Sequence, residues 1–218
     1  MRKGDIIKFG TYPQEVEEPK KSIIEELKQI FYKQPPTPKK QPIKWLVLEA
    51  NENEALLISL YGLAYKEYHY YSTDITWEDC ALRKWLNNDF LKYAFSEEEI
   101  KRIKFSELKN EDNTEYRTRG GNNTKDRIFC LSFNEAEHYF GSDIDRQCKP
   151  TAYAVKQMGI FREIIVRDRH CGWMLRSPGI FHDWAANVDI YGSLNRIGNG
   201  VRMGLDVVRP ALRIICNQ

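Results

Sequence analysis

The 218-residue sequence contains no apolar run near the ~18 residues that a membrane-spanning helix needs. An apolar N-terminal signal region is also missing, because residues 1–5 lead directly into the alternating pattern of a strand. We therefore expect no membrane span. We also expect a cytoplasmic protein, or one exported by a route that needs no N-terminal signal.

An excess of charge of one sign is missing as well. The net charge is +2 at pH 7, too close to balance to indicate nucleic acid or an anionic membrane as a partner. The most basic stretch, residues 101–127, has eight Lys/Arg against five Asp/Glu. That excess is small beside the roughly six to ten phosphate contacts of a strong nucleic-acid binder. Arg117, Arg119, Lys125 and Arg127 could contact an anion, but a solvated, exposed loop over 104–127 is the simpler interpretation.

Signals for metal or cofactor binding are few. The four histidines are scattered without ligand spacing, and no loop gathers the oxygen ligands that calcium requires. No Gly-x-x-x-x-Gly-Lys phosphate loop is present. We expect neither a metal nor a cofactor. The five cysteines are odd in number, widely spaced and without a Cys-x-x-Cys motif, which predicts buried, reduced thiols; they are Cys80, Cys130, Cys148, Cys171 and Cys216.

Apolar periodicity predicts short strands mixed with short helices, an α+β chain in one domain over 1–218. Helix starts are indicated by capping boxes at 76–79, 96–99 and 132–135, and Asn87-Asn88-Asp89 is expected to break the first of these helices. A further helix over 151–158 should end at Gly159. Strands are expected at 5–12, 43–48, 54–59, 128–131, 173–175 and 207–215, with a hairpin turn at 51–53.

Residues 15–42 interrupt this order as an expected insertion. Pro19 can open a helix, and a Pro-rich linker at 34–38 can end it. The apolar positions in between form one stripe of an amphipathic helix: Ile23, Ile24, Leu27, Ile30 and Phe31. The helix over about 20–33 either packs on its own domain or docks a partner.

The stretch Arg176-Ser177-Pro178-Gly179 has the composition of a strand running into a tight turn. Pro178 presets φ at the first corner, and Gly179 would supply the positive φ of a type II turn at the second. We expect Arg176 and Arg209 to act structurally, by bonding loop carbonyls near this turn.

A series of motifs follows in a fixed order along the chain: Phe9-Gly-Thr-Tyr-Pro-Gln14, Ile43-Lys-Trp-Leu-Val-Leu48, Ala55-Leu-Leu-Ile-Ser59, Trp77-Glu78, Leu82-Arg83, Trp85-Leu-Asn87, Phe129, Leu131-Ser132, Glu135, Tyr139-Phe140, Thr151-Ala-Tyr-Ala154, Trp173, Leu175-Arg-Ser-Pro-Gly179 and Val208-Arg-Pro-Ala-Leu212. This order resembles the bacterial and phage domain family of unknown function DUF6273. That family is similar to C-type-lectin-like domains, including formylglycine-generating-enzyme-like modules. The resemblance implies a mixed fold in which the first and last strands pair, two main helices flank the sheet, and a long loop-rich segment carries the binding face.

The loops at about 180–206 are rich in groups suited to recognition. Trp, Tyr and Arg are favoured interface anchors, whereas Asn and Ser adapt their hydrogen bonds to a ligand. The candidate ligand-binding residues are His182, Asp183, Trp184, Asn187, Asp189, Tyr191, Ser193, Asn195, Arg196, Asn199 and Arg202. The first hypothesis is a non-catalytic module that binds a protein or glycan without metal. The competing structural interpretation places Trp184 and Tyr191 in the core.

Two alternatives stay open. One is an enzyme with its site in the same cleft, using Cys171, His182 or Asp183. His170 could activate Cys171, but adjacent strand residues point to opposite faces, which favours a structural Cys171. A formylglycine-generating oxidase would need a reactive cysteine pair near the C-terminus, and the spacing of Cys171 and Cys216 in this sequence does not match one. The other alternative is a phage- or defence-associated interaction protein that docks through the 20–33 helix.

Overall fold

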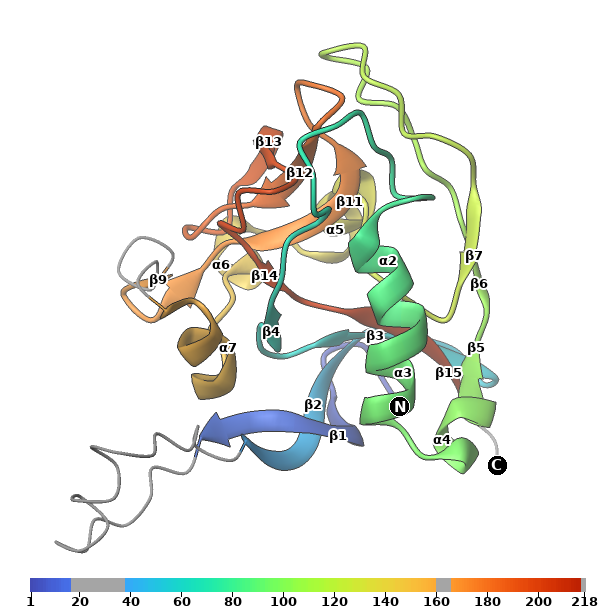
Figure 1. Cartoon of the computed structure of the whole chain (residues 1–218). Coiled ribbons are helices and arrows are strands. Elements are labelled where there is room, and N and C mark those ends of the chain that lie inside the picture. The colour runs from blue at the N-terminus through green and yellow to red at the C-terminus, as the bar shows by residue number, and fades with distance from the viewer. Residues whose placement is uncertain (17–37, 160–165, 217–218) are drawn as a thin grey trace, which may run out of the picture.

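A computed structural model describes residues 1–16, 38–159 and 166–216 (Figure 1). The helix expected at 20–33 and most of the Pro-rich linker lie outside the described residues. Among the residues it describes, no helix is long and apolar enough to cross a membrane. Strands in two main sheets and several short helices make up the chain, so the expected α+β class is confirmed.

The first sheet is antiparallel and holds the strands nearest both ends of the described chain (Figure 1). Its members are β1 (Ile6–Val16), β2 (Pro38–Ala50), β3 (Glu54–Ser59), β15 (Ala211–Ile215), β5 (Ile103–Lys104) and β8 (Ile128–Phe129). The expected hairpin between β2 and β3 is confirmed, and Asn51 shapes its turn because its Oδ1 accepts from the backbone N–H groups of Asn53 and Glu54. Trp45 is fully buried beneath this hairpin, where its indole N–H donates to the carbonyl of Phe9 at 2.7 Å.

The expected pairing of the first and last strands is wrong. The sheet order is β1-β2-β3-β15-β5, so two strands separate β1 from β15. Residues 38–42, expected to belong to the insertion at 15–42, extend β2 and pair with residues 11–16 of β1. β1 is therefore paired along its length with β2. The apolar stretch Ala55–Ile58 of β3 becomes the partner of β15.

The second sheet has the order β13-β12-β11-β14-β4. Its strands are β4 (Ala64–Tyr65), β11 (Trp173–Pro178), β12 (Trp184–Val188), β13 (Leu194–Gly200) and β14 (Val207–Val208). β11 is buried along almost its whole length, as the run Trp173-Met174-Leu175 predicts. A small pair, β9 (Val166–Arg167) and β10 (His170–Cys171), precedes it.

The helix after residue 80 continues where the sequence predicts a break. α2 (Ala81–Trp85) runs through a π-helical turn (Leu86–Phe90) into α3 (Leu91–Ala94). Asn87 and Asn88 do not end it because their side-chain amides donate to the carbonyls four residues back, those of Arg83 and Lys84. The expected capping box at 76–79 is also misplaced, since the N-cap is Cys80, whose Sγ accepts from the backbone N–H of Arg83.

The other helix starts follow the sequence. Ser96 opens α4 (Glu97–Arg102) and Ser132 opens α5 (Phe133–Tyr139), each with a complete capping box. α6 (Asp143–Arg146) follows α5. Thr151 caps α7 (Ala152–Gln157), and Gly159 has a φ of 55° just beyond it, as expected.

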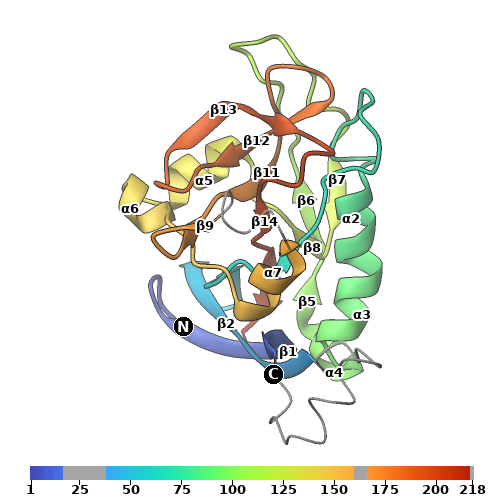
Figure 2. The ribbon, with the colours of Figure 1, turned by 60° about the vertical axis from the view of Figure 1, so that its left-hand side comes forward.

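The segment 104–127 is a long hairpin and not a solvated loop. β6 (Ser106–Leu108) pairs with β7 (Thr124–Asp126), and the tip between them rises to the end of the molecule where the loops of the second sheet lie (Figures 1 and 2). Polar residues of the tip are buried, among them Asn110, Asn113 and Thr118. The predicted exposure is thus wrong for these side chains, but it is correct for charged ones such as Arg117, Arg119 and Lys125.

Candidate functional site

The reversal after β11 differs from the expected type II turn. Pro178 still belongs to β11, and Gly179 is not among the glycines with positive φ. The reversal spans 179–184, closed by the Gly179 N–H donating to the carbonyl of Trp184 at 2.8 Å. Glycine is required for space: a Cβ at Gly179 would lie 2.4 Å from the carbonyl oxygen of Ile197.

The structure separates the predicted binding residues into two groups at opposite ends of β12 and β13. Trp184 pairs with Gly200 at one end, and Val188 pairs with Leu194 at the other. His182, Asp183, Asn199 and Arg202 lie at or beside the first end, together with Trp184. Asp189, Tyr191 and Ser193 form the turn at the second end, with Asn187 and Asn195 paired nearby. A single ligand surface over all of 180–206 is therefore too broad.

Several predicted binding residues use their side chains to hold the fold. Asn187 and Asn199 donate to opposite oxygens of the Asp206 carboxylate, at 2.9 and 2.7 Å. Asp189 accepts from the backbone N–H groups of Tyr191 and Ser193 and so shapes its own turn. Tyr191 is 56% exposed, which excludes a core position for it.

Exposed apolar side chains gather at the first end, on a surface we call the loop face. It comprises the turns at 179–184 and 200–203, the adjacent Ile197 and the segment 69–75. Its most exposed large apolar side chains are Tyr70 (60%), Tyr71 (69%), Phe181 (55%), Ile197 (46%) and Met203 (56%). Sequence reasoning missed the two tyrosines, although the aromatic run Tyr68-His69-Tyr70-Tyr71 is visible in the chain.

The backbone of the loop face is fixed by hydrogen bonds between distant segments. The His69 N–H donates to the carbonyl of Val201, and the Ile75 N–H donates to that of His182, both at 3.0 Å. The Val201 N–H in turn donates to the carbonyl of Asp183 at 2.9 Å. The segment bearing Tyr70 and Tyr71 is thus attached at both ends to the loops of the second sheet.

The tip of the 104–127 hairpin supports the loop face from behind. The Asn113 side-chain amide donates to the carbonyls of Pro178 (3.1 Å), Gly179 (3.3 Å) and Arg196 (3.0 Å). The Thr118 hydroxyl donates to the Gly179 carbonyl at 2.6 Å. Two buried polar side chains therefore fix the start of the 179–184 turn.

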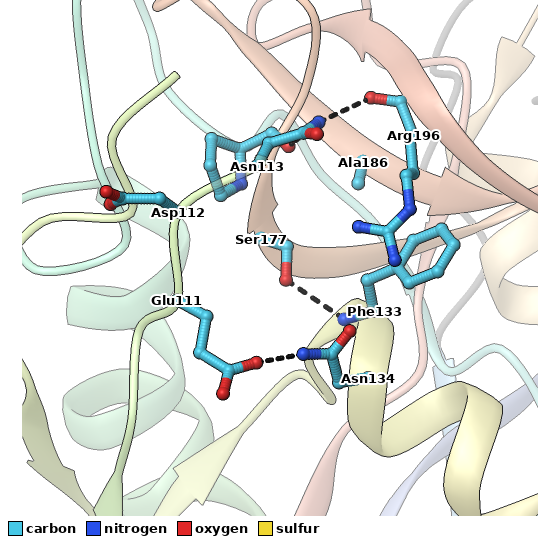
Figure 3. Close-up of a pocket in the computed structure, with 9 residues that line it drawn as sticks. Glu111, Asp112, Asn113, Phe133, Asn134, Ser177, Ala186 and Arg196 are labelled. Carbon is cyan, nitrogen blue, oxygen red and sulfur yellow. Dashed lines mark hydrogen bonds between the residues drawn. The ribbon is translucent and has the colours of Figure 1, made fainter. Parts of the chain in front are cut away.

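A small polar pocket lies beside this anchor (Figure 3). Carboxylates, amides and a guanidinium line a cavity of about 10 Å³, which has room for about one water molecule; the lining residues are Glu111, Asp112, Asn113, Phe133, Asn134, Ser177, Pro178, Ala186 and Arg196. Arg196 covers the Phe133 ring at 3.6 Å from its centroid. The Oδ1 atom of Asn113, one of the lining residues, is buried and has no hydrogen-bond partner among the described residues.

The residues of the enzyme hypothesis are not brought together. Cys171 is fully buried and precedes β11, whereas His182 and Asp183 follow its far end. The six residues of β11 alone span roughly 20 Å at about 3.3 Å per residue. No cleft described here contains all three side chains.

Arg176 and Arg209 are buried within the fold. Arg176 pairs with Glu135 through both guanidinium nitrogens and also donates to the carbonyls of Cys130 (3.0 Å) and Lys109 (3.2 Å). Arg209 donates to the carbonyls of Ser59 and Arg146. Both arginines bond carbonyls as expected, but these belong to other segments and not to the turn after Pro178.

Across residues 1–16, 38–159 and 166–216, no group of three or more His, Cys, Asp or Glu side chains is placed to hold a metal ion. The sequence matches the family described as "Domain of unknown function (DUF6273)" over residues 52–215. The match includes the hairpin at 104–127 and leaves out residues 1–51, where two of the motifs quoted above lie. No curated protein and no solved structure matches the chain.

Proposed function

The chain belongs to the DUF6273 family, and this membership names no activity. We propose that the protein is a non-catalytic recognition module that binds a protein or glycan through its loop face. The observation that carries the proposal is the set of exposed apolar side chains on a fixed backbone. Phe181 and Met203 are each more than half exposed, yet their turns are closed by backbone hydrogen bonds. Exposed apolar groups of this kind mark interaction sites, and a fixed backbone lowers the entropy lost on binding.

The side chains favour a protein over a glycan as the ligand. Ile197 and Met203 are aliphatic, and a flexible methionine adapts to the irregular apolar surface of a protein. Tyr70, Tyr71 and Phe181 add rigid aromatic area, the residue class enriched among interface anchors.

The likeness to C-type-lectin-like folds is part of this proposal. The chain order supports this likeness. β3 and β15 are neighbours in the first sheet, and the long segment between them in the sequence contains the second sheet and the loop face. Against it stands the separation of β1 from β15.

A binding screen against proteins and glycans, with and without EDTA, tests the function. The discriminating variant is Phe181→Ser, and Phe105→Ser is its matched control because Phe105 is 52% exposed but lies at the base of the hairpin. A hot-spot loss of about 2 kcal/mol or more would weaken binding roughly 30-fold. We expect that loss for Phe181→Ser only, with no effect of EDTA.

Two outcomes would contradict the proposal, and a third would contradict the preference for a protein ligand. Equal weakening by both variants would show that the loop face is not the site. Release of the ligand by EDTA would show that recognition depends on a metal. Binding to glycans but to no protein would leave the loop face as the binding site and show that the ligand is a glycan.

A further inference from the structure

Two of the buried cysteines lie directly opposite each other. Cys148 and Cys171 form an antiparallel bridge, in which the Cys171 N–H donates to the Cys148 carbonyl at 2.9 Å. The side chains are buried to 1% and 0% exposure. Opposed residues of antiparallel strands have Cα atoms about 4.5–5.5 Å apart, inside the range of about 4.4–6.8 Å that a disulfide spans. A bond between these two sulfur atoms therefore requires little backbone movement.

A buried cation lies beside the two thiols. Arg209 is 2% exposed and forms no ion pair with a carboxylate in the part of the chain that the structure describes. Its guanidinium donates to the carbonyls of Ser59 (3.0 Å) and Arg146 (3.2 Å) and lies 5.0 Å from the centroid of the Trp173 ring. A buried charge without a counter-charge is unfavourable, so a thiolate here would neutralise it.

The two thiols differ in acidity. Burial alone would raise the pKa of Cys148, but the Cys171 thiol, the Arg209 cation and the backbone N–H of Gly62 together lower it below the ordinary value. The hydrogen bond with Cys148, followed by burial, raises the pKa of Cys171 well above its ordinary value. Cys148 is therefore the more acidic of two directly opposed thiols, which assigns it the attacking role and Cys171 the resolving role.

We propose that Cys148 and Cys171 form a peroxide-oxidisable thiol pair, a modification site separate from the loop face. The Cys148 thiolate attacks one oxygen of hydrogen peroxide, and the O–O bond breaks to give a sulfenic acid and hydroxide. The Cys171 sulfur then attacks the Cys148 sulfur, the S–O bond breaks, and hydroxide leaves as water with the Cys171 proton. Two thiols lose two hydrogens in all, and the peroxide is reduced to two waters.

The arrangement also favours reduction of the disulfide. The Arg209 cation stabilises the thiolate of the reduced form and gains nothing from the neutral disulfide, so the reduced state is preferred. We therefore expect a pair that closes under peroxide and reopens with excess dithiothreitol.

Peroxide treatment of the folded protein tests the site in a Cys216→Ser background, because Cys216 is the only one of the five cysteines that is not buried. The protein is then unfolded in maleimide, digested and mapped by mass spectrometry. Cys80 and Cys130 are the internal controls, since they are equally buried but burial raises the pKa of each thiol. We expect a Cys148–Cys171 crosslink that has lost two hydrogens and is reversed by dithiothreitol, with Cys80 and Cys130 alkylated.

Single variants assign the roles of the two sulfur atoms. Cys171→Ser should leave a sulfenic acid on Cys148 that reacts with dimedone, whereas Cys148→Ser should leave Cys171 unoxidised. Circular dichroism checks that each variant folds, and the mapping of the unmutated pair decides the question if one does not. Absence of the crosslink, or oxidation of Cys80 and Cys130 at the same rate, would overturn the proposal.

Discussion

Asp206 should make the folded state less stable as the pH rises. Its carboxylate is 5% exposed and is bonded only by the amides of Asn187 and Asn199 among the described side chains. Burial raises its pKa from 3.8 to about 6; the two amides oppose this rise, and the charge of Asp189 adds to it. Because the folded pKa lies above the unfolded one, its contribution to stability is fully present below about pH 4 and is lost as the pH rises through about 6.

The magnitude follows from the shift. Roughly two pKa units at about 1.4 kcal/mol per unit give a cost of about 3 kcal/mol for the ionised Asp206 well above pH 6. Most of this cost develops across the window between the two pKa values. The free energy of unfolding of the wild type should therefore fall by about 2 kcal/mol, relative to a non-ionising variant, between about pH 4.5 and about pH 7.5.

Asp206→Asn is that variant. It keeps the shape of the side chain and cannot ionise, although its new NH2 group replaces one of the two oxygens that accept from Asn187 and Asn199, which costs part of one hydrogen bond at every pH. Urea unfolding across this pH range measures the difference between variant and wild type. Asp183→Asn is the matched control, because it removes a negative charge from a half-buried position nearby. If the difference for Asp206→Asn does not change with pH, the buried carboxylate is not ionising as argued.

Two further substitutions test the packing and the hairpin anchor. Trp173→Ala should lower the free energy of unfolding by about 3–5 kcal/mol, because the ring is fully buried. Trp173→Phe should lower it by less, because it loses mainly the 2.9 Å hydrogen bond to the Arg146 carbonyl. If urea unfolding shows a cost below about 0.5 kcal/mol for Trp173→Ala, the ring is not buried as described. Asn113→Ala should cost about 1–3 kcal/mol, since it removes a donor from three carbonyls, of which that of Gly179 keeps the Thr118 hydroxyl. It should also speed hydrogen exchange at Gly179 but not at Leu57, and unchanged exchange at Gly179 would contradict the anchor.

Local signals in the sequence were sufficient to predict a turn or helix start where both partners of the stabilising hydrogen bond lie within a few residues of each other. The capping boxes of Ser96 and Ser132 and the turn at Asn51 depend on contacts two or three residues away, and all three were predictable. The end of α7 was predictable in the same way, because Gly159 just beyond it adopts the positive φ that glycine favours.

Predictions failed where the decisive partner is distant in the chain. Gly179 is glycine because the carbonyl of Ile197 approaches it, which no local turn rule contains. The polar composition of 104–127 was taken for solvation, whereas Asn113 bonds carbonyls up to 83 residues away. The same limit hid the loop face, since the segment 69–75 is joined to the loops of the second sheet only by long-range backbone hydrogen bonds, to Val201 and His182.

The way the hairpin tip supports the 179–184 turn has a consequence for sequence variation. Asn113 and Thr118 bond only main-chain oxygens of that region, which every amino acid supplies. The side chains of His182 and Arg202 are exposed and take no part in these hydrogen bonds. Exposed positions such as 182 and 202 can therefore accept many different side chains, whereas position 179 must stay glycine. That property would let a library of variants at these positions be displayed on one unchanged scaffold.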